Sequence, residues 1–234
     1  MISTHIATRG TPNVLAVFSF RYDAHLVPAM LANVAPLVGG WIAYDDRGSV
    51  EPISDEAQRK ITLLTAARET GAHWVLAVDP DERFEWALAL DIGRLTATRE
   101  ALAYTFRLRE MYTPDSFRVD GLWWKKRQAR LLPIWPGVAV PRGSLHVSWA
   151  AFIPGVRLRD TDFNLYHLKM ITPERRRARA ALYNHLDPER QAQPIGYDYL
   201  TDDEGLKLKR IGAGREYHPP HDDDGGLWMP QLSP

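Results

Sequence analysis

Residues 73–83 of the chain read HWVLAVDPDER, a short apolar run that passes directly into a cluster of acidic residues. Two similar apolar runs precede it: residues 13–20 read NVLAVFSF, and residues 41–46 read WIAYDD. Runs of this kind are typical of strands that are buried on both faces. Helical spacing of apolar residues predicts one helix over 23–38 and a second that begins after Ser54 as its cap. The order strand, helix, strand, helix, strand predicts a parallel sheet with helices on its faces.

The pattern loosens after residue 83, but it still predicts a helix near 87–98 and a C-terminal helix over 173–186, with Thr172 as its cap. The segment from residue 187 onward is polar and rich in Pro, Gly and Asp, which predicts an extended tail. We therefore expect one main domain over residues 10–170, followed by a helix and polar tail over 171–234. Further strands are expected at residues 101–111, 128–134 and 156–168.

The composition of the 234 residues is that of a globular protein, with 45% hydrophobic and 25% charged residues. Lys and Arg number 29, as do Asp and Glu, so the net charge is zero and no nucleic-acid partner is expected. The absence of cysteine excludes disulfides and thiolate zinc sites. The N-terminal residues are polar, and the longest apolar stretch is broken by Pro36, so we expect a cytoplasmic protein without a transmembrane segment.

Acidic residues follow two of the predicted strands. Asp45 and Asp46 end the second strand, and Asp79 and Asp81 follow the third. Ligands of open parallel sheets bind outside the carboxyl ends of the strands, and clustered carboxylates there suit Mg²⁺ or Mn²⁺. A simple turn is the alternative, because Asp and Pro both favour turns. The position directly after a buried strand, together with the second acidic strand end, favours the metal site.

This layout resembles the family 2 glycosyltransferases of GT-A fold. The matching features are the first strand leading into residues 20–23 (FRYD), the strand end at 45–46 and the DPDER stretch at 79–83. The likeness covers residues 13–170 in element order, but its motifs lie in the first 83 residues. It implies an α/β fold with a GT-A-like, mostly parallel twisted sheet flanked by helices. It also implies a hexosyltransferase-like enzyme that uses Mn²⁺ or Mg²⁺ to move a sugar from a nucleotide diphosphate sugar, here a UDP-sugar, to an acceptor hydroxyl with inversion.

The same resemblance implies roles for individual residues. For the metal ion it implies Asp79, Asp81 and a histidine from the C-terminal part, His167, with His146 as second choice. A lone histidine among apolar residues is more often structural, and that alternative stays open. The residues implied to contact the donor nucleotide are Phe20, Arg21, Asp23, Asp45, Asp46 and Asp79.

An inverting transfer needs a base that deprotonates the acceptor hydroxyl. Asp120 and Asp162 are the candidates for this catalytic base, although Asp120 precedes glycine in a turn-like pair and Asp162 fits a solvated position equally well. Glu82 adjoins the metal motif but points away from Asp81 if strand geometry continues, so we interpret it as structural. Arg83 has two options, a pairing with Glu82 or with a phosphate.

Aromatic residues concentrate in the middle of the chain, where they could stack on an acceptor sugar or fill the core. We favour the core for each one singly and expect one of Trp123 and Trp124 to be exposed. The acceptor class, whether glycan, lipid-linked or protein, stays open. The aromatic residues in question are Tyr112, Trp123, Trp124, Trp135 and Trp149.

Four arginines lie close together on the predicted C-terminal helix: Arg175, Arg176, Arg177 and Arg179. Such a patch can touch phosphate or a membrane surface. Because the chain has no net positive charge, a solvated helical face is the favoured interpretation.

Two other functions compete with glycosyl transfer. A non-catalytic protein of the same fold would bind a nucleotide or glycan without transferring the sugar. A sugar nucleotidyltransferase is disfavoured, because it needs a glycine-rich loop after the first strand, where this chain has residues 19–23, SFRYD.

Overall fold

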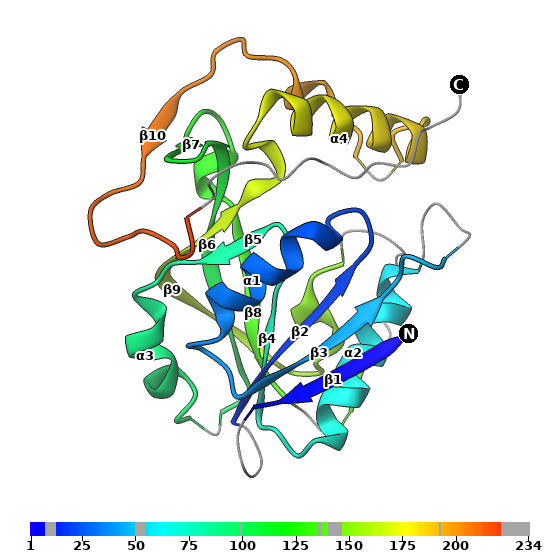
Figure 1. The fold of residues 1–234 in the computed structure, drawn as a ribbon, viewed down its shortest axis with the longest axis vertical. Coiled ribbons are helices and arrows are strands. Elements are labelled where there is room, and N and C mark those ends of the chain that lie inside the picture. Colours follow the sequence, from blue (N-terminus) through cyan, green and yellow to red (C-terminus); the bar gives the residue numbers. More distant parts are fainter. Residues whose placement is uncertain are drawn as a thin grey trace.

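The computed structural model describes residues 1–7, 13–49, 55–98, 100–134, 137–139, 147–191 and 193–220. Over these ranges the chain is an α/β protein whose ten-stranded mixed sheet is flanked by helices (Figure 1). The sheet runs in the order β1-β3-β2-β4-β8-β6-β7-β10, and β9 pairs with both β6 and β5. The strands are β1 (Ile2–Ile6), β2 (Val14–Phe20), β3 (Gly40–Asp45), β4 (Trp74–Ala77), β5 (Glu82–Phe84), β6 (Leu102–Thr113), β7 (Ser116–Arg118), β8 (Arg127–Pro133), β9 (Arg157–His167) and β10 (Leu208–Arg210). The α-helices are α1 (Val27–Val34), α2 (Glu56–Glu69), α3 (Leu88–Leu95) and α4 (Pro173–Leu186).

The predicted alternation of strands and helices in the first part of the chain is confirmed. β2 lies between β3 and β4 and pairs in parallel with both. The first five residues of β2 are buried, as expected for a strand covered on both faces. The three strands that lead into acidic residues therefore share one direction.

The expectation of a mostly parallel sheet is wrong, because the sheet is mixed. β1 joins β3, and β8 joins β4, as antiparallel partners. β8 is also antiparallel to β6, and β6 is parallel to β9. Two successive antiparallel pairings restore the original direction, so β6 and β9 run the same way as β4. The carboxyl ends of β2, β3, β4, β6 and β9 consequently lie at one edge of the sheet.

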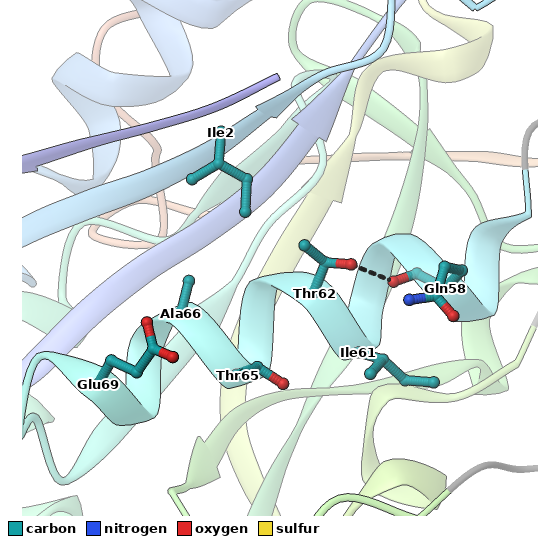
Figure 2. Close-up of a pocket in the computed structure, with 7 residues that line it drawn as sticks. All are labelled: Ile2, Gln58, Ile61, Thr62, Thr65, Ala66 and Glu69. Atoms are coloured by element: carbon teal, nitrogen blue, oxygen red, sulfur yellow. Dashed lines mark hydrogen bonds between the residues drawn. The ribbon is translucent and has the colours of Figure 1, made fainter.

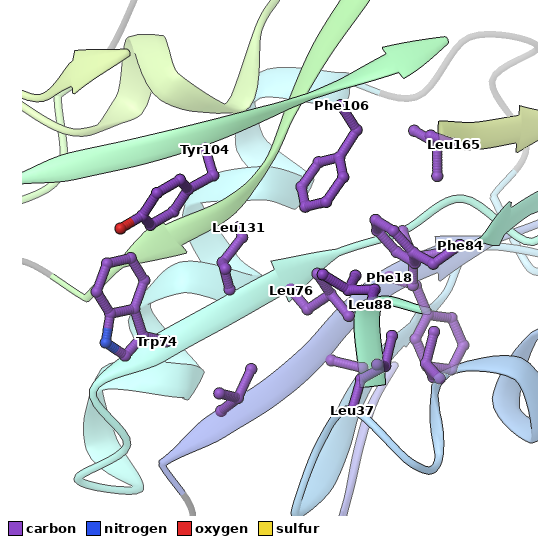
Figure 3. Close-up of a cluster of buried hydrophobic side chains, with 14 of the residues drawn as sticks. Phe18, Leu37, Trp74, Leu76, Phe84, Leu88, Tyr104, Phe106, Leu131 and Leu165 are labelled. Carbon is purple, nitrogen blue, oxygen red and sulfur yellow. The ribbon is translucent and has the colours of Figure 1, made fainter. Parts of the chain in front are cut away.

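The core forms two layers, one on each face of the sheet. On one face α1 and α3 cover β2, β4 and β6, and aromatic side chains such as Phe18, Phe84 and Phe106 fill the space between them (Figure 3). The opposite face is covered by α2 and by the short 3₁₀ helix η3 (Trp149–Phe152). Successive side chains of a strand point to opposite faces, so β2 supplies residues to both layers.

The helix boundaries follow the capping residues. α4 has its predicted limits: the side chain of Thr172 accepts a hydrogen bond from the backbone N–H of Arg175, and proline is the first helical residue. α2 is capped by Asp55, whose side chain accepts from the N–H of Gln58 at 3.0 Å. Ser54, the predicted cap, lies outside the described residues.

The expectation of an extended tail after residue 187 is wrong for residues up to 220. Tyr197, Leu200 and Tyr217 are buried, and β10 adds to the sheet beside β7. The segment also contacts α1, where the side chain of Asn33 donates to the backbone carbonyl of His218 at 2.8 Å. These few apolar residues anchor an otherwise polar segment. Residues 221–234, which hold the rest of the predicted tail, lie outside the described ranges.

Among the helices that the structure describes, none combines the length and apolar character needed to cross a membrane.

Candidate functional site

Six charged side chains meet at the edge of the sheet where the co-directional strands end. Four of them come from strand ends or from the turns that follow, and two come from α4, which follows β9 after the short 3₁₀ helix η4 (Leu168–Met170) (Figure 1). All six are buried or nearly so. We call this group the central cluster: Asp23, Asp81, Glu110, His167, Arg175 and Arg179.

Asp81 is placed by a tight turn between β4 and β5. The backbone N–H of Glu82 donates to the carbonyl of Asp79 at 2.9 Å, and the Glu82 carboxylate accepts from the N–H of Asp79 at 3.0 Å. The carbonyl of Asp81 accepts from the N–H of Leu168 at 2.7 Å, which ties the turn to the end of β9. The stretch is thus a turn, but the side chain of Asp81 is only 6% exposed, unlike that of an ordinary surface turn.

His167 lies between two carboxylates. Its Nδ1 atom is 2.8 Å from Oε2 of Glu110, the residue opposite it on β6, and its Nε2 atom is 3.5 Å from Oδ2 of Asp81. Burial alone would lower the pKa of His167, but the charges of Glu110 and Asp81 raise it well above its usual value. Burial alone would raise the pKa of Glu110, but the charges of His167 and Lys169 lower it to about 2. The imidazole is therefore a cation in this arrangement.

Two arginines of α4 complete the central cluster. The Nη2 atom of Arg179 contacts a carboxylate oxygen of Asp23 and lies 3.0 Å from Oδ2 of Asp81. The Nη2 atom of Arg175 lies 3.3 Å from Oδ1 of Asp23 and 3.9 Å from Oδ2 of Asp81. Burial opposes ionisation of Asp81, yet the charges of His167, Arg179 and Arg175 hold its pKa well below the usual range. Two carboxylates thus share the cationic groups of one helix.

The prediction that the arginines of α4 form a solvated face is wrong. Arg175, Arg176 and Arg179 are buried, and within this group only Arg177 is exposed, paired with Glu174 on the outer face. The guanidinium of Arg176 stacks over the ring of Tyr112 at 3.7 Å. The sequence predicted the helix but not the carboxylates and aromatic ring that its basic face would meet.

A second ion-pair group lies next to the central cluster. Arg130 of β8 contacts Asp79 at 2.7 Å and Glu82 at 2.5 Å. Burial raises the pKa of Glu82 to about 7, although the charge of Arg130 opposes that shift. The side chain of Asp79 is 46% exposed and is oriented toward Arg130, whereas Asp81 is oriented toward α4. The two acids of the DPDER stretch therefore belong to different groups.

Arg83 is buried, and backbone carbonyls occupy its guanidinium. It donates to the carbonyls of Pro80 and Glu82 at 2.7 Å and to that of Leu26 at 3.4 Å. Burial lowers its pKa to about 10. These bonds connect the turn before β5 to the start of α1, so neither of the two predicted pairings describes its position.

The residues expected near the nucleoside lie along the ends of β2 and β3. The carboxylate of Asp45 forms a two-point ion pair with Arg47, whose guanidinium lies over the ring of Phe20 at 5.1 Å. Arg21 donates to the backbone carbonyl of Ser49 at 2.9 Å. This group is more accessible than the central cluster, since the Asp45 side chain is 31% exposed.

Asp46, the neighbour of Asp45, points elsewhere. Its side chain is buried and lies 3.2 Å from Nη1 of Arg59 on α2. Adjacent side chains at a strand end project to opposite sides, as expected. Of the two acids, Asp45 is therefore the one that a ligand can reach.

The two candidate bases differ in their distance from the central cluster. Asp162 lies on β9 five residues before His167, or roughly 16 Å along the strand, and its side chain is 86% exposed beside Arg107. Asp120 follows β7, and the guanidinium of Arg118 donates to both of its carboxylate oxygens, at 3.1 and 2.6 Å. Arg118 also donates to the backbone carbonyl of Tyr199. The hydroxyl of Tyr199 lies 3.5 Å from Nζ of Lys169, which is two residues after His167. Neither acid contacts the central cluster.

The aromatic residues divide as expected. Tyr112 and Trp149 are buried, whereas Trp124 is 51% exposed. The ring of Trp123 packs at a tilt of 38° against that of Tyr199, with ring centroids 4.8 Å apart. Trp135 and the second-choice histidine, His146, lie outside the described residues.

A shallow hollow of about 330 Å³ lies between β1 and α2 (Figure 2). It is lined by Ile2 and by one side of α2, with Glu69 as its one charged side chain. The hollow contains no residue of the central cluster, so we do not assign a site there.

The chemistry of the donor set is compatible with a divalent cation. In the part of the chain that the structure describes, no three carboxylate or imidazole side chains converge into a preformed ion site. However, Asp23 and Asp81 converge on one positive group, the guanidinium of Arg179, and Nε2 of His167 lies beside them. Carboxylate oxygens and imidazole nitrogen are suitable ligands for Mn²⁺, and carboxylates suit Mg²⁺. The residues fit a cation that takes the place of Arg179.

Glu110 is a residue of the central cluster that was not predicted from the sequence, although a signal for it exists. Glu110 lies within a predicted apolar strand, and an acid inside a buried strand must be paired. Glu110 forms an ion pair with His167 on the Nδ1 side of the ring, and a carboxylate in that position supports a ligating histidine.

Replacement of Glu110 by glutamine is expected to change how stability depends on pH. The pKa of Glu110 falls from 4.5 to about 2 in the folded protein, so its contribution is present above pH 4.5 and is lost as the pH falls toward 2. The shift corresponds to roughly 3 kcal/mol at about 1.4 kcal/mol per pKa unit. Urea unfolding at pH 6 and pH 3 should show a wild-type advantage that shrinks at the lower pH. A gap that is the same at both values contradicts an ionised Glu110; Asp162→Asn, at an exposed position, is the control.

Comparison of the chain with models of known protein families and with curated protein sequences finds no match.

Proposed function

We propose that the protein is a metal-dependent glycosyltransferase of GT-A-like fold, which moves a sugar from a UDP-sugar to an acceptor hydroxyl with inversion. The observation that carries this proposal is that Asp23 and Asp81 converge on Arg179, with His167 beside Asp81, at the edge where five co-directional strands end. Ligands of open α/β sheets bind at this edge. The carboxylates there already pair with a positively charged side chain, Arg179, and a cation-dependent diphosphate site requires carboxylates that bind a positive group.

In this proposal each group of side chains has one task. Asp23 and Asp81 would supply carboxylate oxygens, and His167 would supply Nε2 after the ion displaces its proton, while Glu110 pairs with the ring on the Nδ1 side. A Mn²⁺ or Mg²⁺ ion held by these residues would supply charge neutralisation for the departing diphosphate. Phe20, Arg21 and Asp45 lie toward the nucleoside, as the accessible group at the ends of β2 and β3.

Asp120 is the better candidate for the catalytic base. Arg118 lowers the pKa of Asp120 although burial opposes this, so the group is a carboxylate at neutral pH. Asp162 is exposed, but it lies five residues along the strand from His167. The acceptor hydroxyl would approach from the side of β7 and the 3₁₀ helix η5 (Asp198–Leu200).

A non-catalytic protein that binds a nucleotide or glycan is the second candidate. One observation favours it: the carboxylates of Asp23, Asp81 and Asp120 are all engaged by arginines. The two candidates differ in turnover, so hydrolysis of a UDP-sugar in the presence of Mn²⁺ separates them.

Thermal unfolding with UDP, UDP-hexoses and other nucleotide diphosphates, each with and without Mn²⁺, tests the proposal. We expect UDP compounds to raise the melting temperature, and Mn²⁺ to increase the shift. Asp45→Ala is expected to weaken nucleotide binding by roughly ten- to hundredfold with or without Mn²⁺, because a hydrogen-bond partner worth about 1–3 kcal/mol is lost. Arg94→Ala, at an exposed pair on α3, is the control. The absence of a shift with every nucleotide diphosphate contradicts the proposed function.

A further inference from the structure

Arg175 and Arg179 lie one helical turn apart on the buried face of α4. The side chain of Arg175 is fully buried, and that of Arg179 is 10% exposed. Both are directed at Asp23 and Asp81, whereas Arg177 lies on the solvent side of the same helix with a side chain that is 64% exposed. The helix therefore delivers two positive charges to the carboxylates that the proposed function assigns to the metal.

These two arginines have more donors than the structure uses. Nε and Nη1 of Arg175, and Nε of Arg179, are buried without a hydrogen-bond partner among the described residues. Leaving a buried donor unpaired is unfavourable, and more so when the group is charged. A guanidinium presents its donors in a planar fork that matches the oxygens of a phosphate. The unused donors of this pair indicate an acceptor of that geometry.

Arg179 and a divalent cation would compete for the carboxylates of Asp23 and Asp81. Arg179 contacts both Asp23 and Asp81, so it occupies the position between them where a divalent cation would bind. A guanidinium and a divalent cation repel each other, and the same two carboxylates cannot neutralise both at short range. Binding of the cation therefore requires Arg179 to find another negative partner.

Resting on the proposed function, we propose that Arg179 is the resident cation of the ligand-free site and competes with the divalent ion for Asp23 and Asp81. When a nucleotide diphosphate binds, Arg179 and Arg175 transfer their contacts from these carboxylates to the diphosphate. The ion and the diphosphate then assist each other, because the diphosphate supplies the partner that Arg179 needs when it leaves the carboxylates. Coupling between linked sites is typically about 5- to 150-fold in affinity, and the same factor acts in both directions.

Calorimetric titration of the full chain tests this exchange, with Mn²⁺ alone, inorganic pyrophosphate alone and UDP in the presence of Mn²⁺ as the probes. In Arg179→Gln, we expect Mn²⁺ alone to bind at least about fivefold tighter, and UDP with Mn²⁺ at least about fivefold weaker. Arg177→Gln, on the exposed face of the same helix, should match the wild type in both titrations. These opposite signs are not expected from a purely structural arginine, whose loss would weaken both.

A second variant keeps the test valid if Arg179→Gln does not fold. Arg179→Lys retains the charge but loses the planar fork and part of the reach, so it should change both affinities in the same directions by smaller factors. In the wild type, saturating pyrophosphate should tighten Mn²⁺ binding. Equal Mn²⁺ affinities in wild type and both variants, or an absence of coupling with pyrophosphate, would overturn the inference.

The outcomes also separate this inference from the proposed function. If Arg179→Gln tightens Mn²⁺ binding but no sugar nucleotide binds, the competition stands and the proposed function falls. If UDP-sugars bind with Mn²⁺ while Arg179→Gln changes neither affinity, the proposed function stands and the inference falls.

Discussion

The substitution Asp81→Asn is expected to abolish the Mn²⁺-dependent part of nucleotide diphosphate binding, a loss of at least about a hundredfold in affinity. Asp81 is the carboxylate that lies beside both His167, at 3.5 Å, and Arg179, at 3.0 Å, so it stands at the centre of the proposed cation site. An asparagine retains the shape but carries no charge, and a hundredfold loss corresponds to about 2.7 kcal/mol. Calorimetry of UDP binding with and without Mn²⁺ measures the effect, and UDP-sugar hydrolysis should be lost with it.

The same substitution removes a negative charge that faces three positive ones, so folding must be checked before binding. Loss of one partner of a buried ion pair costs about 3–5 kcal/mol of unfolding free energy. Asp91→Asn is the matched control, because it makes the same chemical change at a surface pair on α3, where the side chain is 37% exposed. A folded Asp81→Asn protein that binds UDP with unchanged affinity in Mn²⁺ would contradict the metal assignment.

The substitution Arg130→Met is expected to lower the unfolding free energy by about 3–5 kcal/mol at pH 8. Arg130 is buried and is placed between Glu82 and Asp79, so its removal leaves the carboxylate of Glu82 without its cation in the interior. Burial has already raised the pKa of Glu82 to about 7, so the buried carboxylate becomes charged only as the pH rises above that value. Without Arg130 this buried charge has lost its closest counter-charge. The deficit should therefore be smaller at pH 5, where Glu82 takes up a proton. Urea unfolding at the two pH values measures both effects.

Two further variants identify the cause of that deficit. Adding Glu82→Gln to Arg130→Met removes the stranded charge and should recover part of the stability at pH 8. Arg94→Met breaks a surface pair with Asp91 and should cost less than about 1 kcal/mol. A deficit below about 1 kcal/mol for Arg130→Met would show that this buried group contributes little.

Local patterns were sufficient to predict the first part of the fold. Residues 13–20 and 73–78 are apolar without alternation, and strands with that composition need cover on both faces, which the parallel pairing of β2 with β3 and β4 provides. The limits of α4 were also predictable, because Thr172 and Pro173 are capping signals that act within one turn of the chain.

The direction of the remaining strands was not predictable in this way. β8 pairs with β4 although β5, α3, β6 and β7 lie between them in the chain. This antiparallel pairing, together with that of β8 and β6, makes the sheet mixed. β5, β7 and β10 have three residues each, too few for a hydrophobic period to be recognised. Their pairings depend on contacts between segments that are distant in sequence.

The sequence alone determined where acids follow strands, because a buried strand must end before a charged residue and the carboxyl ends of co-directional strands meet. It therefore placed Asp81 at this edge, while Asp23 and His167 were expected there only through the family resemblance, and it determined that residues 173–186 form a helix. Only the tertiary structure decided that Glu110 faces His167, that Arg130 takes Asp79 out of the central cluster, and that the arginines of α4 turn inward. The physical reason is that a charge can be buried only beside its counter-charge. In this protein those counter-charges come from distant parts of the chain, so Asp23 meets Arg175 and Arg179 only after the sheet and α4 have packed together.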